Sequence, residues 1–284
     1  MIIFFENGRV GNQLFQYIGL KEYFPKEKLI FFGCQSLNNL FDNIDVCFLN
    51  KNKFTKIFLF SLPRLIFNFL ADLRVISSIE ENDKLDNFNL IVKKGLIANC
   101  FIAKEIYFQH KDIIKKIKNV PKIKKIYKKK ALRWFKKKKI DLKMNSPVFV
   151  HIRRGDYCNW PSKDYPAVLN YSWYVKSMLL IKKKLKKKLI FVIMGDDINY
   201  IRRNFKESKS LFISNNCFEI DLAIMTICTS GILSASSFSW WGAFYSRLNK
   251  KNKGIFIGPK FWAGYRLKKF FPSNFIVDWI TYLK

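Results

Sequence analysis

The sequence predicts an α/β protein built on a doubly wound parallel sheet, and two observations support this class. Short apolar segments alternate with segments of helical periodicity through the second half of the chain. Residues 2–23 follow the same order, with an apolar segment, a glycine-containing loop and a helical segment. The chain has 284 residues, of which 49% are hydrophobic and 17% aromatic. This length and composition allow one large domain or two small ones and exclude a disordered protein.

The elements of the first half follow from short local patterns. Residues 2–5 and 29–32 are apolar runs typical of buried strands, and residues 13–23 have helical periodicity. Helices with weakly marked ends are expected between 50 and 110. The lysine-rich stretch 115–145 predicts a helix and a linker between two halves of the chain. Apolar residues recur there at helical spacing, namely Ile123, Ile126, Tyr127, Ala131 and Trp134.

The second half alternates more clearly between the two kinds of element. Strands are predicted at 148–152, 189–194, 211–213, 231–235 and 254–257, and helices at 171–185, 219–228 and 240–248. Parallel sheets of this kind bind ligands beyond the carboxyl ends of their strands. Polar residues that follow these strands are therefore the candidate functional residues.

The charge of the chain is strongly positive, with a formal net charge of +31. Fourteen Lys and Arg residues lie in 115–139 without an acidic residue, and six lysines lie in 182–188. Three explanations stay open: a solvated surface in a Lys-, Asn-, Ile- and Phe-rich chain, an anionic membrane, and nucleic acid. The 42 Lys against 10 Arg disfavour direct base recognition, which relies on arginine.

Cysteine use and hydropathy restrict the cellular setting. Six cysteines without a CxxC pair and only two histidines exclude a zinc module and suggest reduced thiols. No segment has the pattern of a signal peptide. The most apolar window, residues 57–71, is interrupted by Pro63-Arg64 and is shorter than the roughly 20 residues of a membrane span. We therefore expect a cytoplasmic protein, with peripheral binding to the inner membrane as an open alternative.

Two adjacent arginines follow the predicted strand 148–152, in the sequence HIRRGD at 151–156. In extended backbone His151, Arg153 and Gly155 lie on one face. A guanidinium binds phosphate through paired hydrogen bonds and keeps its proton, so this strand end suggests a diphosphate site. A structural Arg–Asp pair beside a surface turn is the alternative.

A second candidate is the loop GRVGNQ at 8–13, between the first predicted strand and helix. It matches neither the dinucleotide-binding fingerprint nor the Walker loop. Its glycines could let the backbone approach a ligand, with helix N–H groups directed at a phosphate. A plain strand-to-helix turn explains the same residues.

A third candidate is SASSFSWWG at 234–242, where hydroxyl groups follow a predicted strand and precede a helix. Ser236 or Ser237 could cap the helix and contact a ligand oxygen, which would form a phosphate cradle without a metal. Simple capping explains the same residues. Trp240 and Trp241 are expected in the core.

A fourth candidate is the pair Asp196 and Asp197, which follows the predicted strand 189–194. Two carboxylates at a strand end can bind Mg²⁺, or they can cap the next helix. We favour capping or a packing role. His110 has no partner in the sequence and is assigned no role.

Four stretches, in this order, resemble the bacterial α-1,2-fucosyltransferases of glycosyltransferase family 11. They are GRVGNQLFQY at 8–17, FVHIRRGDY at 149–157, DLAIMTICTSGILSASSFSWWGAF at 221–244 and IGPKFW at 257–262. The second carries the H-x-RR-x-D motif of the family and the third its S-[ST]-[FY]-SWW segment. The first departs from the family pattern, which begins with two glycines, because Asn7 and Arg9 flank Gly8. Residues 34–145 carry no matching motif.

The resemblance implies a GT-B-type fold, in which two Rossmann-like halves face each other across a cleft. It implies an acceptor-side domain at 1–145 and a GDP-sugar-binding domain at 146–284. The implied reaction moves L-fucose from GDP-β-L-fucose, with inversion, to the 2-hydroxyl of a galactose in lipopolysaccharide, O-antigen or capsule. No metal or other cofactor and no nucleic acid is implied. A related transferase with another nucleotide sugar or linkage stays open.

The resemblance also assigns roles to residues at matching positions. Arg153 would bind the β-phosphate of GDP, His151 would lie near the nucleotide, and Asp156 would support that loop and is the candidate general base. The residues that would contact substrate are Gly11, Asn12, Arg154, Asp221, Ser236 and Ser237. A fixed guanidinium beside the departing phosphate would replace the divalent ion of metal-dependent enzymes.

Overall fold

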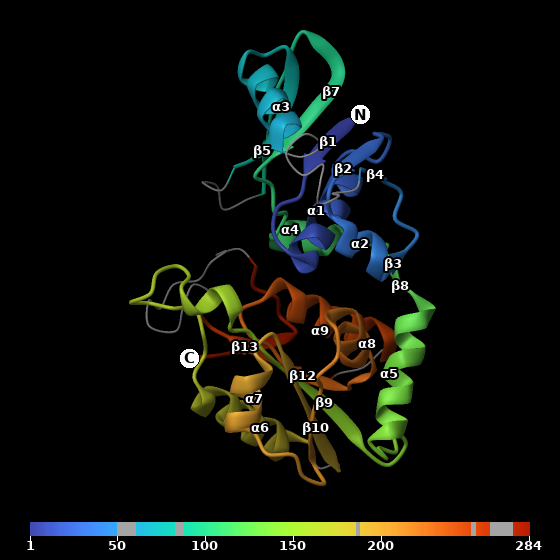
Figure 1. Ribbon diagram of the computed structural model, residues 1–284, viewed down its shortest axis with the longest axis vertical. Coiled ribbons are helices and arrows are strands. Elements are labelled where there is room, and N and C mark those ends of the chain that lie inside the picture. The colour runs from blue at the N-terminus through green and yellow to red at the C-terminus, as the bar shows by residue number, and fades with distance from the viewer. Residues whose placement is uncertain (50–60, 83–87, 186–187, 251–253, 262–274) are drawn as a thin grey trace. The chain divides into compact units, whose positions relative to one another are not determined.

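The computed structural model describes residues 1–49, 61–82, 88–185, 188–250, 254–261 and 275–284. The chain divides into two compact units, Met1–Ile123 and Lys124–Lys284. Each unit contains a six-stranded sheet whose strands are mostly parallel and are accompanied by helices (Figure 1). This arrangement confirms the predicted α/β class.

The boundary between the units precedes the lysine-rich helix α5 (Lys125–Lys137), whereas the sequence suggested a boundary after residue 145. Helix α5 packs against α8 (Phe218–Ile227) of the second unit and buries Ala131 and Phe135. The predicted helix is therefore present, but its packing makes it part of the second unit.

The second unit contains a parallel sheet in the order β11-β10-β9-β12-β13-β14. Its strands are β9 (Ser146–Ile152), β10 (Leu189–Gly195), β11 (Leu211–Ile213), β12 (Ser230–Ile232), β13 (Phe256–Pro259) and β14 (Ile280–Leu283). This is the Rossmann order, in which the direction of strand addition reverses between the first strand, β9, and the fourth, β12. Ligands bind beyond the carboxyl ends of the strands at such a reversal, so the loops after β9 and β12 mark the expected site.

Helices cover both faces of this second sheet. They are α6 (Tyr171–Lys184), α7 (Ile198–Asn204), α8 and α9 (Ser237–Lys250), while the short η2 (Gly155–Cys158) follows β9 and α5 packs on α8. Trp173 of α6 and Ile201 of α7 pack with Val150 of β9 on one face. Helices α8 and α9 pack against each other and against β9 and β12 from the other face (Figure 1). Burial on both faces explains why β9 and β10 are continuous apolar runs in the sequence.

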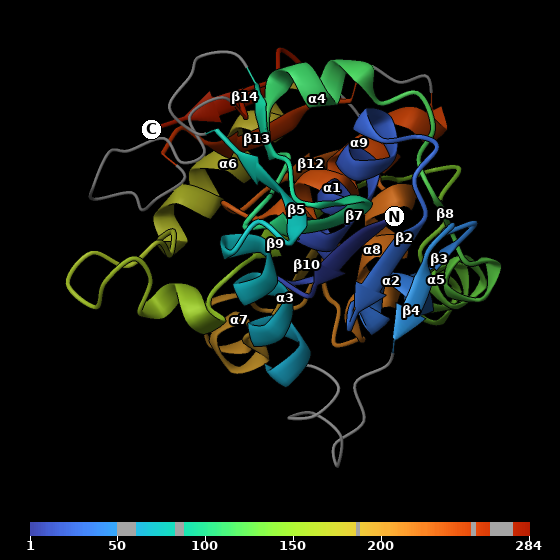
Figure 2. The ribbon, with the colours of Figure 1, turned by 90° about the horizontal axis from the view of Figure 1, so that it is seen from above.

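The first unit contains a sheet in the order β4-β2-β1-β7-β5-β6, in which only β6 is antiparallel to its neighbour. The strands are β1 (Ile2–Phe5), β2 (Leu29–Phe32), β4 (Cys47–Leu49), β5 (Ile76–Glu81), β6 (Leu90–Lys93) and β7 (Ile97–Lys104). Helices α1 (Val10–Tyr23) and α3 (Leu62–Asp72) lie on opposite sides of these strands (Figure 2). The shorter elements are α2 (Gln35–Leu40), β3 (Phe41–Asp42), α4 (Lys111–Lys116) and β8 (Lys122–Ile123).

The expectation of helices between 50 and 110 is met by one helix, and most of the described part of that range forms strands. Helix α3 is present, but β5, β6 and β7 follow it, while residues 50–60 and 83–87 lie outside the described residues. In β5, Ile76 and Ile79 are three residues apart, which is a helical spacing. Pairing with β7 fixes this segment as a strand and buries Ser77 and Ser78 within it.

Two further observations concern membrane-spanning helices and the cysteines. Within the described residues, no helix combines the length and apolarity needed to cross a membrane. The six cysteines all lie in the described ranges and are free thiols.

Candidate functional site

The carboxyl end of β9 brings the Arg153 guanidinium to the reversal point of the second sheet. Arg153 forms an ion pair with Asp156, and its Nη1 atom lies 2.8 Å from Asp196 Oδ2. The guanidinium also lies over the ring of Tyr157, 5.1 Å from its centroid. Only 11% of the Arg153 side chain is exposed. Two carboxylates and a ring therefore hold the cation in one orientation.

The neighbouring Arg154 is held from α7. Its guanidinium carbon lies 3.9 Å from the centroid of the Tyr200 ring, and its Nε lies 3.4 Å from Asp197 Oδ2. This Nε is buried and has no hydrogen bond partner among the described residues. The charge of Arg154 is nevertheless balanced by Asp197, at a separation longer than a good hydrogen bond.

The two aspartates after β10 have different structural roles. Asp197 caps α7 by accepting the N–H of Tyr200 at 2.9 Å, which confirms the predicted capping. Asp196 binds the Arg153 guanidinium and also accepts the backbone N–H of Arg154 at 2.8 Å. Both carboxylates are thus engaged with the arginine pair. In the described ranges, no three His, Cys, Asp or Glu side chains are grouped as metal ligands.

His151 connects the two strands on either side of the reversal point. Its Nδ1 atom is hydrogen-bonded to the Ser234 hydroxyl beyond β12 at 2.7 Å, and its ring lies against Phe238. Burial, reinforced by the charge of Arg153, lowers the pKa of His151 to about 3. The imidazole is therefore neutral at ordinary pH, and as a neutral group it can hold the loop after β12 in place beside Arg153.

Beyond β12, the serines lead into α9. The helix begins at Ser237, so Ser236 occupies the residue before it, and the carbonyl of Ser236 accepts the N–H of Trp240 at 3.0 Å. The hydroxyl of Ser239 donates to the same carbonyl. Trp240 and Trp241 are each 1% exposed, which confirms that they belong to the core. The predicted phosphate contacts of Ser236 and Ser237 stay predictions.

Asp221 lies in the first turn of α8 and is 6% exposed. It accepts a 2.5 Å hydrogen bond from the Ser214 hydroxyl, and Asn216 donates in turn to that hydroxyl. Burial raises the pKa of Asp221 to about 7, although the bond from Ser214 opposes this shift. The carboxylate therefore supports the loop between β11 and α8, and its predicted contact with guanine stays a prediction.

Gly11 and Asn12 lie in the first turn of α1, which begins at Val10 rather than at residue 13. Gly8 has φ +79°, and a Cβ there would lie 2.5 Å from Asn12 Nδ2, so this turn requires glycine. Asn12 Oδ1 accepts a hydrogen bond from Gln109. These residues belong to the first unit, and the predicted contact of Gly11 and Asn12 with the donor stays a prediction.

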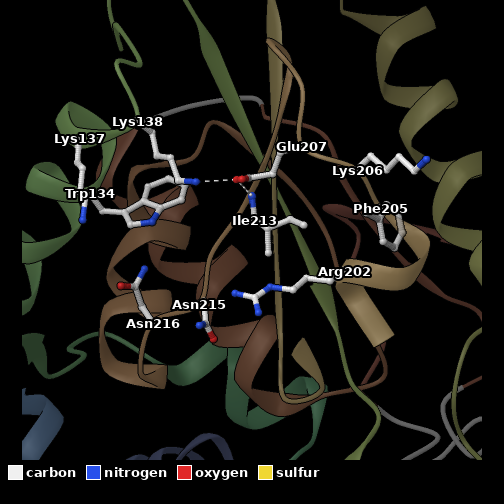
Figure 3. A pocket seen from close by; sticks show the side chains of 10 residues that line it. All are labelled: Trp134, Lys137, Lys138, Arg202, Phe205, Lys206, Glu207, Ile213, Asn215 and Asn216. Carbon is white, nitrogen blue, oxygen red and sulfur yellow. Dashed lines mark hydrogen bonds and ion pairs between the residues drawn. The ribbon is translucent and has the colours of Figure 1, made fainter. Parts of the chain in front are cut away.

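A surface pocket of about 620 Å³ in the second unit was not predicted (Figure 3). Trp134 from α5 and Arg202 from α7 lie on two sides of it. Glu207 accepts the N–H of Ile213 on the edge strand β11 at 2.9 Å and pairs with Lys138 at 2.6 Å. These two contacts lower the pKa of Glu207, and the first of them satisfies one backbone N–H of the edge strand. None of the predicted site residues lines this pocket.

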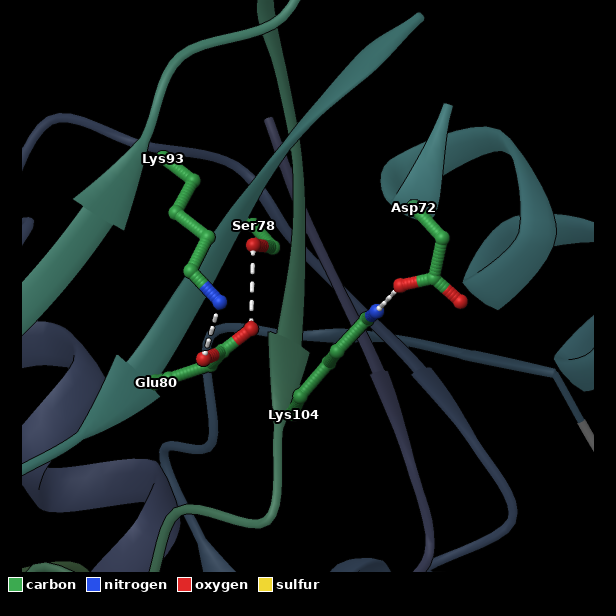
Figure 4. A network of polar contacts seen from close by, with 5 residues as sticks. All are labelled: Asp72, Ser78, Glu80, Lys93 and Lys104. Carbon is green, nitrogen blue, oxygen red and sulfur yellow. Dashed lines mark hydrogen bonds and ion pairs between the residues drawn. The ribbon is translucent and has the colours of Figure 1, made fainter. Parts of the chain in front are cut away.

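A polar pocket of about 460 Å³ lies in the first unit, at the carboxyl ends of β1, β5 and β7. Helix α3 forms one wall with Arg64, Asn68 and Asp72. Asp72 is paired with Lys104 at a distance of 2.6 Å, and Glu80 with Lys93 at 2.7 Å (Figure 4). Sequence reasoning missed this pocket because its residues come from a part of the chain without a recognisable motif.

Asp196 and the segment 234–242 were candidates from the sequence, but their contacts with the residues after β9 were not predicted. Asp196 and Tyr200, from the segment after β10, contact Arg153 and Arg154, and Ser234, from the segment after β12, is hydrogen-bonded to His151. Because both strands neighbour β9, their carboxyl ends meet at one edge of the sheet. Strand order was the missing signal, and the spacing of residues along the chain does not contain it.

Comparison with known proteins agrees with this architecture. The sequence model of glycosyl transferase family 11 matches residues 97–283. The chain is 27% identical to the O-antigen biosynthesis glycosyltransferase WbnK of Escherichia coli over 145 residues, 49% of this chain and 47% of the relative. It is 32% identical to an alpha-1,2-colitosyltransferase of Escherichia coli over 127 residues, 43% of this chain and 42% of the relative. The chain thus spans just under half the length of these relatives.

Solved structures are similar over most of the chain. The fucosyltransferase NodZ from Bradyrhizobium has a TM-score of 0.52 at 11% identity, with 85% of this chain and 91% of that chain covered. The glycosyl transferase family 9 protein from Veillonella parvula has a TM-score of 0.53 at 8% identity, with 99% and 86% covered. At these identities the likeness concerns the fold alone, and it confirms the predicted GT-B-type class.

Proposed function

The chain belongs to glycosyl transferase family 11, and from this premise we propose that it is an inverting, metal-independent α-1,2-fucosyltransferase. The proposed donor is GDP-β-L-fucose, and the acceptor is the 2-hydroxyl of a galactose in a cell-surface glycan. The relative named for O-antigen biosynthesis supports a lipopolysaccharide glycan as the acceptor. We place the reaction in the cytoplasm.

One observation carries the proposal. Arg153 and Arg154 lie directly beyond the carboxyl end of β9, at the reversal of strand order, and both are held by aspartates that follow the neighbouring strand β10. A guanidinium has five N–H donors, so Arg153 can keep its two carboxylate partners and still donate to a phosphate. Arg154, stacked on Tyr200 and paired with Asp197, places a second cation beside Arg153.

The chemistry that suits this arrangement is departure of a nucleoside diphosphate. The bond between the anomeric carbon and the β-phosphate oxygen breaks, and its electron pair stays on the phosphate as GDP leaves. The acceptor oxygen bonds to the opposite face of that carbon, so a β-linked donor gives an α-linked product. Cations fixed before the reaction stabilise the charge that grows on the phosphate oxygen.

The acceptor hydroxyl must also lose its proton. Asp156 is the candidate base, but its carboxylate is paired with Arg153. That contact favours a positioning role for Asp156, in which the carboxylate orients the guanidinium. His151 is neutral and hydrogen-bonded to Ser234, and we assign it a positioning role for the loop after β12. Proton transfer to solvent or to the departing phosphate would then suffice.

The polar pocket of the first unit supports recognition of a sugar acceptor by that unit. Amide and carboxylate groups of Asn7, Asn68 and Glu105 line it, and such groups hydrogen-bond sugar hydroxyls. The pocket lies at the carboxyl ends of β1 and β7, where strand order in this sheet also reverses.

A second donor deserves a direct comparison, because a relative with 32% identity is named an alpha-1,2-colitosyltransferase. Transfer of colitose in the same linkage would need the same diphosphate site and a different sugar contact. Fucose transfer and colitose transfer therefore differ in the donor sugar, and the arginine pair would bind the diphosphate in both.

The decisive experiment incubates the protein with GDP-fucose, GDP-colitose or GDP-mannose and a panel of galactosides. We expect transfer from GDP-fucose, with the linkage read by NMR as α-1,2. Excess EDTA should leave the rate nearly unchanged, because the arginine pair supplies the positive charge. Transfer from another donor, or loss of activity in EDTA with recovery in Mg²⁺ or Mn²⁺, would contradict the proposal.

A further inference from the structure

Helix α3 of the first unit presents large apolar side chains to solvent. They recur at positions i, i+3, i+4, i+7 and i+11, with 44% to 67% of each side chain exposed: Leu62, Leu65, Ile66, Phe69 and, directly after the helix, Leu73. Residues with this spacing lie on one side of a helix. One entire side of α3 is therefore apolar and exposed.

The polar residues of α3 lie on a different side. Arg64, Asn68 and Asp72 are spaced four residues apart and line the polar pocket, where Asp72 is paired with Lys104 (Figure 4). Phe67 and Leu70 pack toward the sheet. A surface helix normally turns its charged residues to water. In α3 the polar row faces a pocket, and leucine, isoleucine and phenylalanine face the solvent.

The apolar surface continues past the end of the helix. The N–H of Leu96 donates to the carbonyl of Arg74 at 2.9 Å, and the N–H of Ile97 donates to that of Val75 at 2.8 Å. These bonds hold Leu96, 87% exposed, and Ile97, 53% exposed, beside the residues that follow α3. Seven large exposed apolar side chains then form one surface, which is more than the scattered residues usual on a monomer.

We propose that this α3 surface, formed by Leu62, Leu65, Ile66, Phe69, Leu73, Leu96 and Ile97, docks the protein on an anionic lipid bilayer. With 11 residues, α3 is too short to span a bilayer of roughly 20 helical residues. It would lie in the plane of the interface, with its apolar side among the acyl chains. Lipid conforms to a protruding helix and requires no complementary groove.

Charge decides between a bilayer and a second copy of the chain. Exposed cations border the α3 surface, namely Arg74 directly after Leu73 and Lys94 before Leu96, whereas the neighbouring Lys93 is paired with Glu80. A second copy would carry the same net charge of +31, so repulsion opposes self-association. Anionic headgroups attract this charge while the acyl chains receive the apolar side chains. Docking of this kind does not depend on which nucleotide sugar the enzyme uses.

The test measures co-sedimentation of the full chain with vesicles of phosphatidylcholine, with and without phosphatidylglycerol. We expect binding to the vesicles that contain phosphatidylglycerol. The double substitution Leu65→Asn with Phe69→Asn should lower the partition coefficient at least ~10-fold, since two buried side chains are lost. A matched control is Leu132→Asn with Leu179→Asn, two exposed leucines of the second unit, which should leave binding within about twofold.

Several outcomes would overturn the proposal. Failure of the parent chain to bind, or an equal loss in the control, would remove the α3 surface as the contact. Binding that survives the double substitution and disappears when Lys128, Lys129 and Lys130 become glutamine would move the contact to α5. A dimer in light scattering that the double substitution abolishes would make a second copy the occupant. A lowered Tm in the double variant would show that another part of the chain covers these side chains.

Discussion

At the scale of single residues, Arg153 is the group on which catalysis should depend most. Replacement by lysine keeps the charge but removes the planar donors that meet two carboxylates and a phosphate together. We expect Arg153→Lys to lower kcat at least ~100-fold, as for other lost stabilisers of a transition state. Steady-state kinetics with GDP-fucose measures the loss, and circular dichroism checks folding. Full turnover in this variant would remove Arg153 from the mechanism.

Two buried groups make opposite contributions to the pH dependence of stability. The pKa of His151 is about 3 in the folded chain against 6.5 ordinarily, so acidification below pH 6.5 protonates the unfolded chain first and lowers the free energy of unfolding. The pKa of Asp221 is about 7 against 3.8, so raising the pH between these values ionises the unfolded chain first and also lowers that free energy. Between pH 4 and 6.5 the two slopes oppose each other.

Single substitutions should separate these slopes. Relative to the parent, His151→Gln should make the free energy of unfolding fall more steeply as pH rises from about 4.5 to about 6.5. Asp221→Asn, which can still accept the bond from Ser214, should make it rise more steeply. Urea denaturation at several pH values measures both slopes. Parallel curves for all three proteins would show that neither group titrates as its burial implies.

At the scale of elements, the placement of α5 leads to a prediction about domain boundaries. A fragment of residues 124–284 keeps α5 on α8, whereas a fragment of residues 146–284 exposes the apolar surface that Ala131 and Phe135 cover. We expect cooperative urea unfolding of the longer fragment and aggregation or loss of cooperativity in the shorter one. In the full chain, Phe135→Ala should cost ~3–5 kcal/mol of stability. Equal stability of the two fragments would contradict the assignment of α5 to the second unit.

The elements that could be predicted are the buried ones, because burial requires a run of apolar residues that is visible in the sequence. Strands β9 and β10 are buried on both faces, and each is largely an apolar run, while the half-buried edge strand β11 is a short apolar run. Strands β5 and β6 lie toward one end of the first sheet and mix polar with apolar residues, so their pairing decides their conformation. In α5 the helical spacing correctly located Ala131, although Ile126 on the same predicted face is 54% exposed.

The residues of the candidate site also divide into those that could be predicted from the sequence and those that could not. The arginine pair, Asp221 and the serines before α9 could be found because they occur in short motifs. Asp196 could be found as a polar residue after a strand, but its bond to Arg153 depends on β10 lying beside β9. The polar pocket of the first unit could not be found, because its walls come from α3 and the ends of three strands that are far apart in the sequence.

At the scale of the whole molecule, the net charge of +31 predicts binding to polyanions that are not substrates of the proposed enzyme. Helix α5 shows how the charge is carried, since most of its lysines are exposed while Ala131 and Phe135 are buried. Exposed, mutually repelling cations interact with any polyanion through counterion release, and they do so without sequence preference. Association with nucleic acid is therefore expected at low salt. A steep loss of affinity as salt rises would identify this association as non-specific.

Binding of DNA and binding of GDP should respond differently to salt and to the substitution Arg153→Ala. Affinity for a mixed-sequence DNA duplex should fall about 10³-fold or more between roughly 50 and 200 mM salt, because many phosphates are contacted at once. Affinity for GDP should change far less, because one diphosphate meets a fixed, partly buried arginine pair. Arg153→Ala should weaken GDP binding and leave DNA affinity almost unchanged. Fluorescence anisotropy for DNA and calorimetry for GDP measure the four values. Nanomolar DNA binding that persists at physiological salt in the Arg153→Ala variant, with no GDP binding by the parent, would favour a nucleic-acid-binding protein over a transferase.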